Sequence, residues 1–123
     1  MQRWYQNGKL HRTNGPAEIQ YYENNNIGLQ SWWQNSKLHC TDGPAIVWYY
    51  ENGNIQRQHW KQNNKLHRTD GPAVEQFSEE GNLQYTEYYI NGKRLTYEQW
   101  QKKVLADKLV SNDKQNKPKN MGL

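Results

Sequence analysis

The sequence is short of the aliphatic residues that build most protein cores. Leu, Ile, Val and Phe together account for 19 of its 123 residues. A share below ~20% usually indicates a disordered chain. Six Trp and nine Tyr are present instead, and each such ring can bury on the order of 150–250 Å². We therefore expect one folded domain whose packing depends on aromatic rings.

Cysteine and long apolar runs are also scarce. The single cysteine, Cys40, excludes an intrachain disulfide and any CxxC metal site. The mean hydropathy is −1.32, and no stretch approaches the ~18 apolar residues of a membrane-spanning helix. The chain begins with Met1-Gln2-Arg3-Trp4, without an apolar signal region. These features predict a cytoplasmic protein.

Positive charge is concentrated at the C-terminal end. The net charge is +4, and residues 96–123 hold six Lys against Glu98, Asp107 and Asp113. Nucleic-acid binding requires Lys and Arg side chains arrayed along one face of the folded part. We therefore expect no specific nucleic-acid partner.

A 28-residue repeat organises most of the chain. The sequence YQNGKLHRTNGPA from Tyr5 returns as WQNSKLHCTDGPA from Trp33 and as KQNNKLHRTDGPA from Lys61. A partial copy, YINGKRL, starts at Tyr89. Such periodicity predicts a repeat array over residues 1–95. Its units are 4–31, 32–59, 60–87 and the partial copy 88–95.

Two turn signals recur in each repeat. The first is Asn7-Gly8 and its counterparts at 35–36, 63–64 and 91–92, a pair typical of type I′ hairpin turns. The second is Glu51-Asn52-Gly53-Asn54, with counterparts at 23–26 and 79–82. The Asn/Asp-Gly-Pro-Ala steps at 14–17, 42–45 and 70–73 should interrupt strand pairing, because Pro lacks a backbone donor. The fold class is thus all-β, an antiparallel meander of tandem hairpins.

The last residues predict a helix. Thr96 and Gln99 fit a capping box, and Tyr97, Trp100, Val104 and Leu105 share one helical face. We expect a C-terminal capping helix over residues 96–111 that covers the last strand of the array. Residues 112–123 should form a disordered basic tail.

The repeat resembles a divergent, longer variant of the MORN repeat. The resemblance covers residues 4–95 and lies in the aromatic-x-Asn-Gly-Lys-x-His segment, followed by a Gly-containing step and a second turn. It departs from the MORN pattern in its period and in its Gly-Pro-Ala step. The kind it resembles occurs in phages, large DNA viruses and bacteria, so a viral chain would act in the host cytoplasm. MORN-like arrays imply an antiparallel sheet used as a scaffold, a dimerisation surface or a lipid contact.

Histidine and lysine recur once per repeat. His11, His39 and His67 lie on separate repeats, roughly 10–14 Å apart at the usual strand spacing, and ligands of one metal ion must converge at about 2.0–2.2 Å from it. We expect no metal and no cofactor, with each histidine hydrogen-bonded inside its own repeat. Lys9, Lys37 and Lys65 form a basic column at the hairpin turns, either solvated or in contact with an acidic partner or lipid phosphates.

The aromatic residues are the other binding candidates. Trp4, Trp32, Trp60 and Tyr88 form one ladder, with Trp33 and Trp48 elsewhere on the sheet. Such rings can stack on ligands or hold the sheet together through cross-strand pairs. No unique nucleophile with a base in reach stands out, so we expect no enzyme.

The leading interpretation is a binding or scaffold module for protein–protein interaction. Either the edge at Gln2–Gln6 or an aromatic sheet face would pair with a target protein or with a second copy as a homodimer. The alternative is a viral or phage counter-defence protein that sequesters a small ligand or nucleotide. A peripheral lipid binder is the least favoured option.

Overall fold

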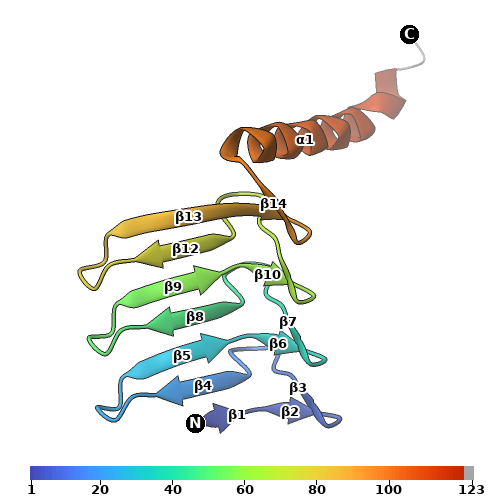
Figure 1. The fold of residues 1–123 in the computed structure, drawn as a ribbon. Coiled ribbons are helices and arrows are strands. Elements are labelled where there is room, and N and C mark those ends of the chain that lie inside the picture. The colour runs from blue at the N-terminus through green and yellow to red at the C-terminus, as the bar shows by residue number, and fades with distance from the viewer. Residues whose placement is uncertain (121–123) are drawn as a thin grey trace.

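A computed structural model describes residues 1–120 as an open antiparallel β-sheet with short hairpins along one side and a helix beyond its last strand (Figure 1). The eight strands of the large sheet follow the order β1-β4-β5-β8-β9-β12-β13-β14. Their bounds are Gln2–Arg3, Glu18–Tyr21, Ile27–Ser31, Ile46–Tyr49, Ile55–His59, Val74–Phe77, Leu83–Ile90 and Lys93–Leu95. The predicted hairpin meander with one C-terminal helix is confirmed.

Three small hairpins lie between strands of the large sheet in the sequence. They are β2–β3 (Tyr5–Gln6 and Lys9–Leu10), β6–β7 (Trp33–Gln34 and Lys37–Leu38) and β10–β11 (Lys61–Gln62 and Lys65–Leu66). Figure 1 shows them stacked along one side of the sheet. Backbone hydrogen bonds of 2.9–3.0 Å link each hairpin to the next, from the amides of Ser36 and Asn64 to the carbonyls of Leu10 and Leu38. A third, from the Gly92 amide to the Leu66 carbonyl at 2.8 Å, links the last hairpin to the turn between β13 and β14. A second hydrogen-bonded column therefore runs beside the sheet.

The hairpin turns have the backbone that their sequence predicts. At all four Asn-Gly-like pairs both central residues have positive φ, from 49° at Asn91 to 83° at Gly92. This is the conformation of a type I′ turn. The second turn of each repeat also contains one left-handed residue, namely Asn25, Gly53 or Gly81.

The Gly-Pro-Ala steps form the corners between hairpins and sheet. In the first repeat, β3 ends at Leu10 and β4 begins at Glu18, so pairing is interrupted there as expected. The alanine of each step is fully buried, and its carbonyl accepts the backbone N–H of the ladder tryptophan at 2.7–2.8 Å. These pairs are Trp4 with Ala17, Trp32 with Ala45 and Trp60 with Ala73.

Side chains join the repeats at the opposite edge of the sheet. The amides of Asn24 and Asn26 donate to the Glu51 carbonyl at 3.1 and 2.7 Å, and Asn52 and Asn54 contact Glu79 in the same way at 3.0 and 2.8 Å. The recurrent asparagines thus stabilise the stacking of neighbouring turns.

The helix α1 (Tyr97–Asn120) packs against the end of the sheet at β13 and β14. Its capping box is present, with Gln99 N donating to Thr96 Oγ1 at 3.1 Å and Thr96 N donating to Gln99 Oε1 at 3.0 Å. Trp100 and Val104 are buried against Ile90.

Two expectations about the helix differ from the structure. Tyr97 and Leu105 are 51% and 58% exposed; Trp100 and Val104 form the buried contact with Ile90, and Tyr97 packs on Tyr88 with one side of its ring. The helix also continues past residue 111 to Asn120. No Gly or Pro interrupts residues 97–117, and Pro118 falls in the last turn. The predicted tail, 112–123, thus overlaps the helix up to residue 120, and residues 121–123 lie outside the described part.

Candidate binding surface

The side chains of the large sheet form rows, because paired residues share a face and successive residues alternate between faces. One face carries two rows: Arg3, Glu18, Ser31, Ile46, His59, Val74 and Glu87, then Gln20, Leu29, Trp48, Arg57, Gln76 and Tyr85. The row between them lies on the opposite face: Gln2, Ile19, Gln30, Val47, Gln58, Glu75 and Thr86.

The two faces differ in how closely they follow the 28-residue repeat. On the first face, equivalent positions hold unlike residues: Arg, Ser, His and Glu at 3, 31, 59 and 87; Leu, Arg and Tyr at 29, 57 and 85; Gln, Trp and Gln at 20, 48 and 76. The opposite face keeps Gln at 2, 30 and 58 and an aromatic ring at 21, 49 and 77, and departs from the repeat at Thr86 and Glu75. We call the first one the variable face. Residues that the fold needs recur in each repeat, so this face carries most of the residues that the fold does not require.

Trp48 and His59 form the centre of the variable face. Their ring centroids are 4.8 Å apart in an edge-to-face arrangement with an interplanar angle of 71°. Arg57 Nε donates to His59 Nε2 at 2.7 Å. Burial, followed by the charges of Arg57 and Lys61, lowers the pKa of His59 to about 4. The imidazole is therefore neutral at pH 7, and its Nε2 accepts a hydrogen bond from the guanidinium N–H.

Towards the N-terminal strands, Trp33 is fixed on the variable face. Its indole Nε1 donates to Ser31 Oγ at 2.7 Å, and Ser31 is fully buried. At the sheet edge, Arg3 and Glu18 form an ion pair at 2.8 Å.

Towards the C-terminal strands, Glu87 and Arg94 form the second charged pair of the variable face. The Glu87 carboxylate accepts hydrogen bonds from the hydroxyls of Tyr85 and Tyr89 and lies 3.8 Å from Arg94 Nη2. The bond from Tyr85 is the main reason why the pKa of Glu87 is lowered. The variable face thus has an aromatic centre and a charged pair at each end.

The ladder of Trp4, Trp32, Trp60 and Tyr88 does not form an exposed stack. These residues occupy the corners, and each is partly buried. The Arg12 guanidinium lies 3.9 Å from the ring centroid of Trp4, and that of Arg68 lies 3.7 Å from the centroid of Trp60. Tyr88 packs on Trp100 of α1, with centroids 4.9 Å apart. Three of the four rings thus have a covering partner within the chain.

The histidines connect neighbouring repeats, and the expectation that each bonds inside its own repeat was wrong. The Nδ1 atoms of His11, His39 and His67 accept backbone N–H groups from the next hairpin turn, those of Asn35, Asn63 and Asn91, at 3.2, 3.1 and 3.0 Å. Accepting these bonds requires an unprotonated Nδ1. Burial also lowers the pKa of His67. This role explains why the histidine recurs.

The lysine column lies where the sequence places it. Lys9, Lys37 and Lys65 are exposed on β3, β7 and β11, directly after the turns. The aliphatic stem of Lys65 lies beside Gly92 of the following turn.

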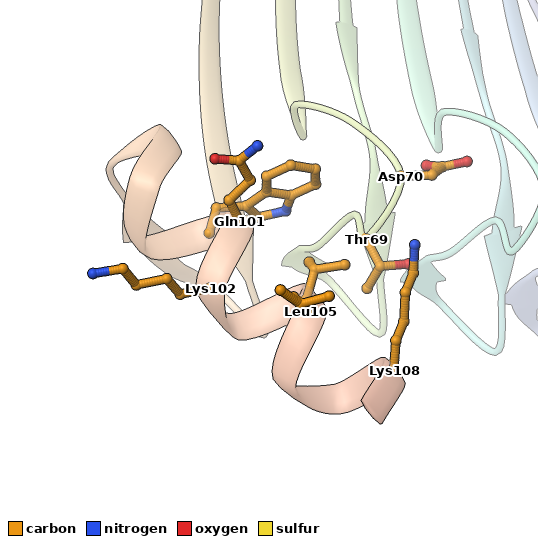
Figure 2. A pocket seen from close by; sticks show the side chains of 8 residues that line it. Thr69, Asp70, Gln101, Lys102, Leu105 and Lys108 are labelled. Atoms are coloured by element: carbon orange, nitrogen blue, oxygen red, sulfur yellow. The ribbon is translucent and has the colours of Figure 1, made fainter. Parts of the chain in front are cut away.

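Cavities lie along the corners and beneath the helix. A cavity of about 640 Å³ separates α1 from the loop at Thr69 and Asp70. Figure 2 shows Leu105 and Lys108 on its helical side and Thr69 and Asp70 on the other. A second cavity, of about 400 Å³, lies between the first and second repeats at Trp32 and Cys40. The sheet itself has two separate edge strands, β1 and β14, and encloses no barrel-like interior among residues 1–120.

The described residues contain neither a metal-binding group nor a membrane-spanning helix. No three His, Cys, Asp or Glu side chains in this part of the chain are grouped to hold a metal ion. The helix that the structure describes is not apolar enough over a sufficient length to cross a bilayer. Comparison of the chain with known protein families, curated proteins and solved structures finds no match.

The candidate residues therefore separate into two groups. Trp33 and Trp48 lie on the variable face, whereas the ladder rings, the histidines and the lysines lie at the corners and hairpins. Arg57, His59 and Glu87 were not among the predicted site residues. Departure from the 28-residue pattern is the signal that would have found them, because each differs from its counterparts in the other repeats.

Proposed function

We propose that the chain is a non-enzymatic, MORN-like scaffold that binds protein through the variable face, and that its first partner is a second copy of itself. The observation that carries this proposal is that repeat-breaking residues are more frequent on one side of the sheet than on the other. Repeat proteins use such extended surfaces for recognition.

The middle of the variable face is partly accessible: Trp48, Arg57 and His59 are partly exposed, whereas Ser31 and Val74 are fully buried. Figure 1 places α1 beyond β14, at the end of the sheet rather than across it. The centre of the face presents Trp48 and Trp33, both partly exposed, and aromatic side chains are enriched in protein interfaces. The charged pairs Arg3–Glu18 and Glu87–Arg94 flank this centre, as a polar rim flanks an interface core.

The distribution of charge favours a two-fold partner. In a symmetric dimer the same patch meets itself in the reverse direction. A two-fold axis near Trp48 would bring the Arg3–Glu18 end of one copy over the Glu87–Arg94 end of the other. Each end contains one acid and one base, so the acid of one copy can pair with the base of the other at both ends.

Polar groups that could serve catalysis have structural partners. The histidine Nδ1 atoms accept backbone bonds, and burial raises the pKa of the Cys40 thiol, which donates to Asp42 Oδ1 at 3.4 Å. A thiol with a raised pKa is a poor nucleophile at neutral pH.

Two neighbouring residues of β8 provide the test. Trp48 and Tyr49 are both partly buried aromatics, but they point to opposite faces. We expect Trp48→Ala to weaken self-association at least tenfold in sedimentation equilibrium, and Tyr49→Ala to leave it within about twofold, since truncation of a central aromatic costs ≥2 kcal/mol. Equal effects of both substitutions, with both variants folded by circular dichroism, would contradict the proposal.

The cavities favour one alternative, the sequestering of a small ligand. The openings at Trp32 and at α1 have volumes of about 400 and 640 Å³, within the range of small-molecule sites. A protein purified gently from cells would then retain a small molecule, and native mass spectrometry would record its added mass.

A further inference from the structure

Two arginines occupy equivalent sites in the first and third repeats. Besides stacking on Trp4, Arg12 donates to Asn14 Oδ1 at 3.3 Å and to the Pro16 carbonyl at 3.2 Å. Arg68 stacks on Trp60 and donates to Asp70 Oδ1 at 2.8 Å and to the Pro72 carbonyl at 3.1 Å, with Glu75 as a further acceptor at 3.2 Å. Each corner therefore holds a guanidinium by one ring face, one side-chain oxygen and one backbone carbonyl.

The glycine of the Gly-Pro-Ala step makes room for this guanidinium. A Cβ atom on Gly15 would lie 3.1 Å from Arg12 Cζ, and one on Gly71 would lie 2.7 Å from Arg68 Cζ. Neither glycine has the left-handed φ that would otherwise explain its presence. The glycine therefore recurs because it allows the guanidinium to approach the backbone.

The second repeat has the same corner without an arginine. Trp32, Asp42, Gly43 and Pro44 occupy the equivalent positions, but Cys40 stands where the other repeats have Arg12 and Arg68. Gly43 is retained although its nearest neighbour in the structure is Cys40 Sγ, 3.8 Å from the Cβ position. The glycine leaves room here for a larger group than the thiol.

The size of the cavity changes with this residue. The cavity lined by Trp32, His39, Cys40 and Asp42 has a volume of about 400 Å³, and Arg12 and Asn14 of the first repeat border it on the other side. The matching cavity at Trp60, His67, Arg68 and Asp70, bordered by Thr41 and Asp42, has about 170 Å³. Arg68 thus fills part of the equivalent cavity in the third repeat. Among residues 1–110, whose side chains the structure describes, no ring or guanidinium stacks on Trp32.

We propose that the cleft at Trp32 binds the guanidinium group of an arginine side chain from a partner polypeptide. The guanidinium stacks on Trp32 and donates to the Asp42 carboxylate and the Pro44 carbonyl, as Arg68 does in its own repeat. A planar guanidinium matches this site better than an ammonium, because it stacks on a ring and donates in its own plane. We call this cleft the arginine cleft.

A polypeptide is the preferred source because the cleft is open. Thr41 and Asp42 at its rim are exposed, and one stacked cation contributes only about 0.5–2 kcal/mol. A lone arginine would therefore bind weakly, whereas a chain that carries it can add contacts along the corner. The choice of source rests on the proposed protein-binding function; the preference for guanidinium does not.

The first test is a titration of the full-length chain with N-acetyl-arginine methylamide, followed by two-dimensional NMR of amide and indole N–H groups. We expect saturable shifts at the Trp32 indole and the Thr41 amide. They should persist in Cys40→Ser and weaken at least tenfold in Cys40→Arg, which supplies its own guanidinium. Absence of saturable shifts in the natural chain, or equal shifts in Cys40→Arg, would overturn the proposal.

Three further comparisons test which chemical group the cleft prefers and whether the ligand comes from a polypeptide. Asp42→Asn removes only the charge of the side chain and should weaken binding of the blocked arginine about tenfold. This variant also provides the test if Cys40→Arg does not fold. Blocked lysine should bind more weakly, and equal binding would refute the guanidinium preference. Tenfold tighter binding of free arginine than of blocked arginine would refute the polypeptide source.

The outcome is independent of the variable face. Arg68 reaches Glu75, a residue of the opposite face, so the corner sites border that side of the sheet. Trp48→Ala should therefore leave the titration unchanged, and Cys40→Arg should leave self-association unchanged. Failure of one proposal is thus distinguishable from failure of the other.

Discussion

The His59 imidazole makes the stability of the fold sensitive to mildly acidic pH. Its pKa of about 4 in the folded chain lies below the ordinary value of 6.5, so the unfolded chain takes up the proton first as the pH falls. We expect the free energy of unfolding to decrease by about 1–2 kcal/mol between pH 6.5 and 4, less than full linkage gives, because the ring is partly exposed. Below pH 4 this contribution levels off, and urea denaturation across the range measures it.

His59→Gln is the control for this prediction. The variant cannot titrate, and its amide can still accept a hydrogen bond from Arg57. Its free energy of unfolding should depend less steeply on pH over the same range. The dependence that remains comes from His67, whose pKa is also lowered. An unchanged slope would show that His59 is not the responsible group.

At the scale of the element, the hairpin turns differ in how well their residues suit the backbone. Ser36 has a φ of 63° where Gly8 and Gly92 have 76° and 83°, and a non-glycine residue in this region costs about 1–2 kcal/mol. Ser36→Gly should stabilise the chain by about 0.5–1 kcal/mol after the entropy of the unfolded glycine is counted. A shift of the urea midpoint measures the gain.

Asn64 provides the matched control. It has a φ of 69°, but its Oδ1 also accepts the Leu38 N–H at 2.7 Å. Asn64→Gly relieves the same strain and loses a hydrogen bond of about 1 kcal/mol, so it should give no gain. Equal stabilisation by both substitutions would refute the assignment of a structural role to the Asn64 side chain.

The elements were predictable where a short segment determines them. Asn7-Gly8 specifies its turn, the Gly-Pro-Ala step specifies the corner, and Thr96 with Gln99 specifies the start of α1. The bonds of His11 and Asn24 to the following repeat were not predictable, because they depend on how successive repeats stack. The exposure of Leu105 depends likewise on how little of the sheet the helix meets.

At the scale of the whole molecule, the repeated sequence builds a single open sheet with two different faces. The sequence analysis selected candidates mainly by recurrence, such as the ladder of Trp4, Trp32, Trp60 and Tyr88. The strand register changes that selection, because it gathers the residues that break the pattern, such as Trp48, Arg57 and His59, on one face. Cys40 breaks the pattern separately, at the arginine cleft.

The central claim is that this face joins two copies of the chain. The most direct test is native mass spectrometry of the full-length protein over a range of concentrations. We expect a species of twice 14.7 kDa without added mass, whose share rises with concentration and falls in Trp48→Ala but not in Tyr49→Ala. A mass of one chain at every concentration, or a dimer that both variants retain, would contradict it.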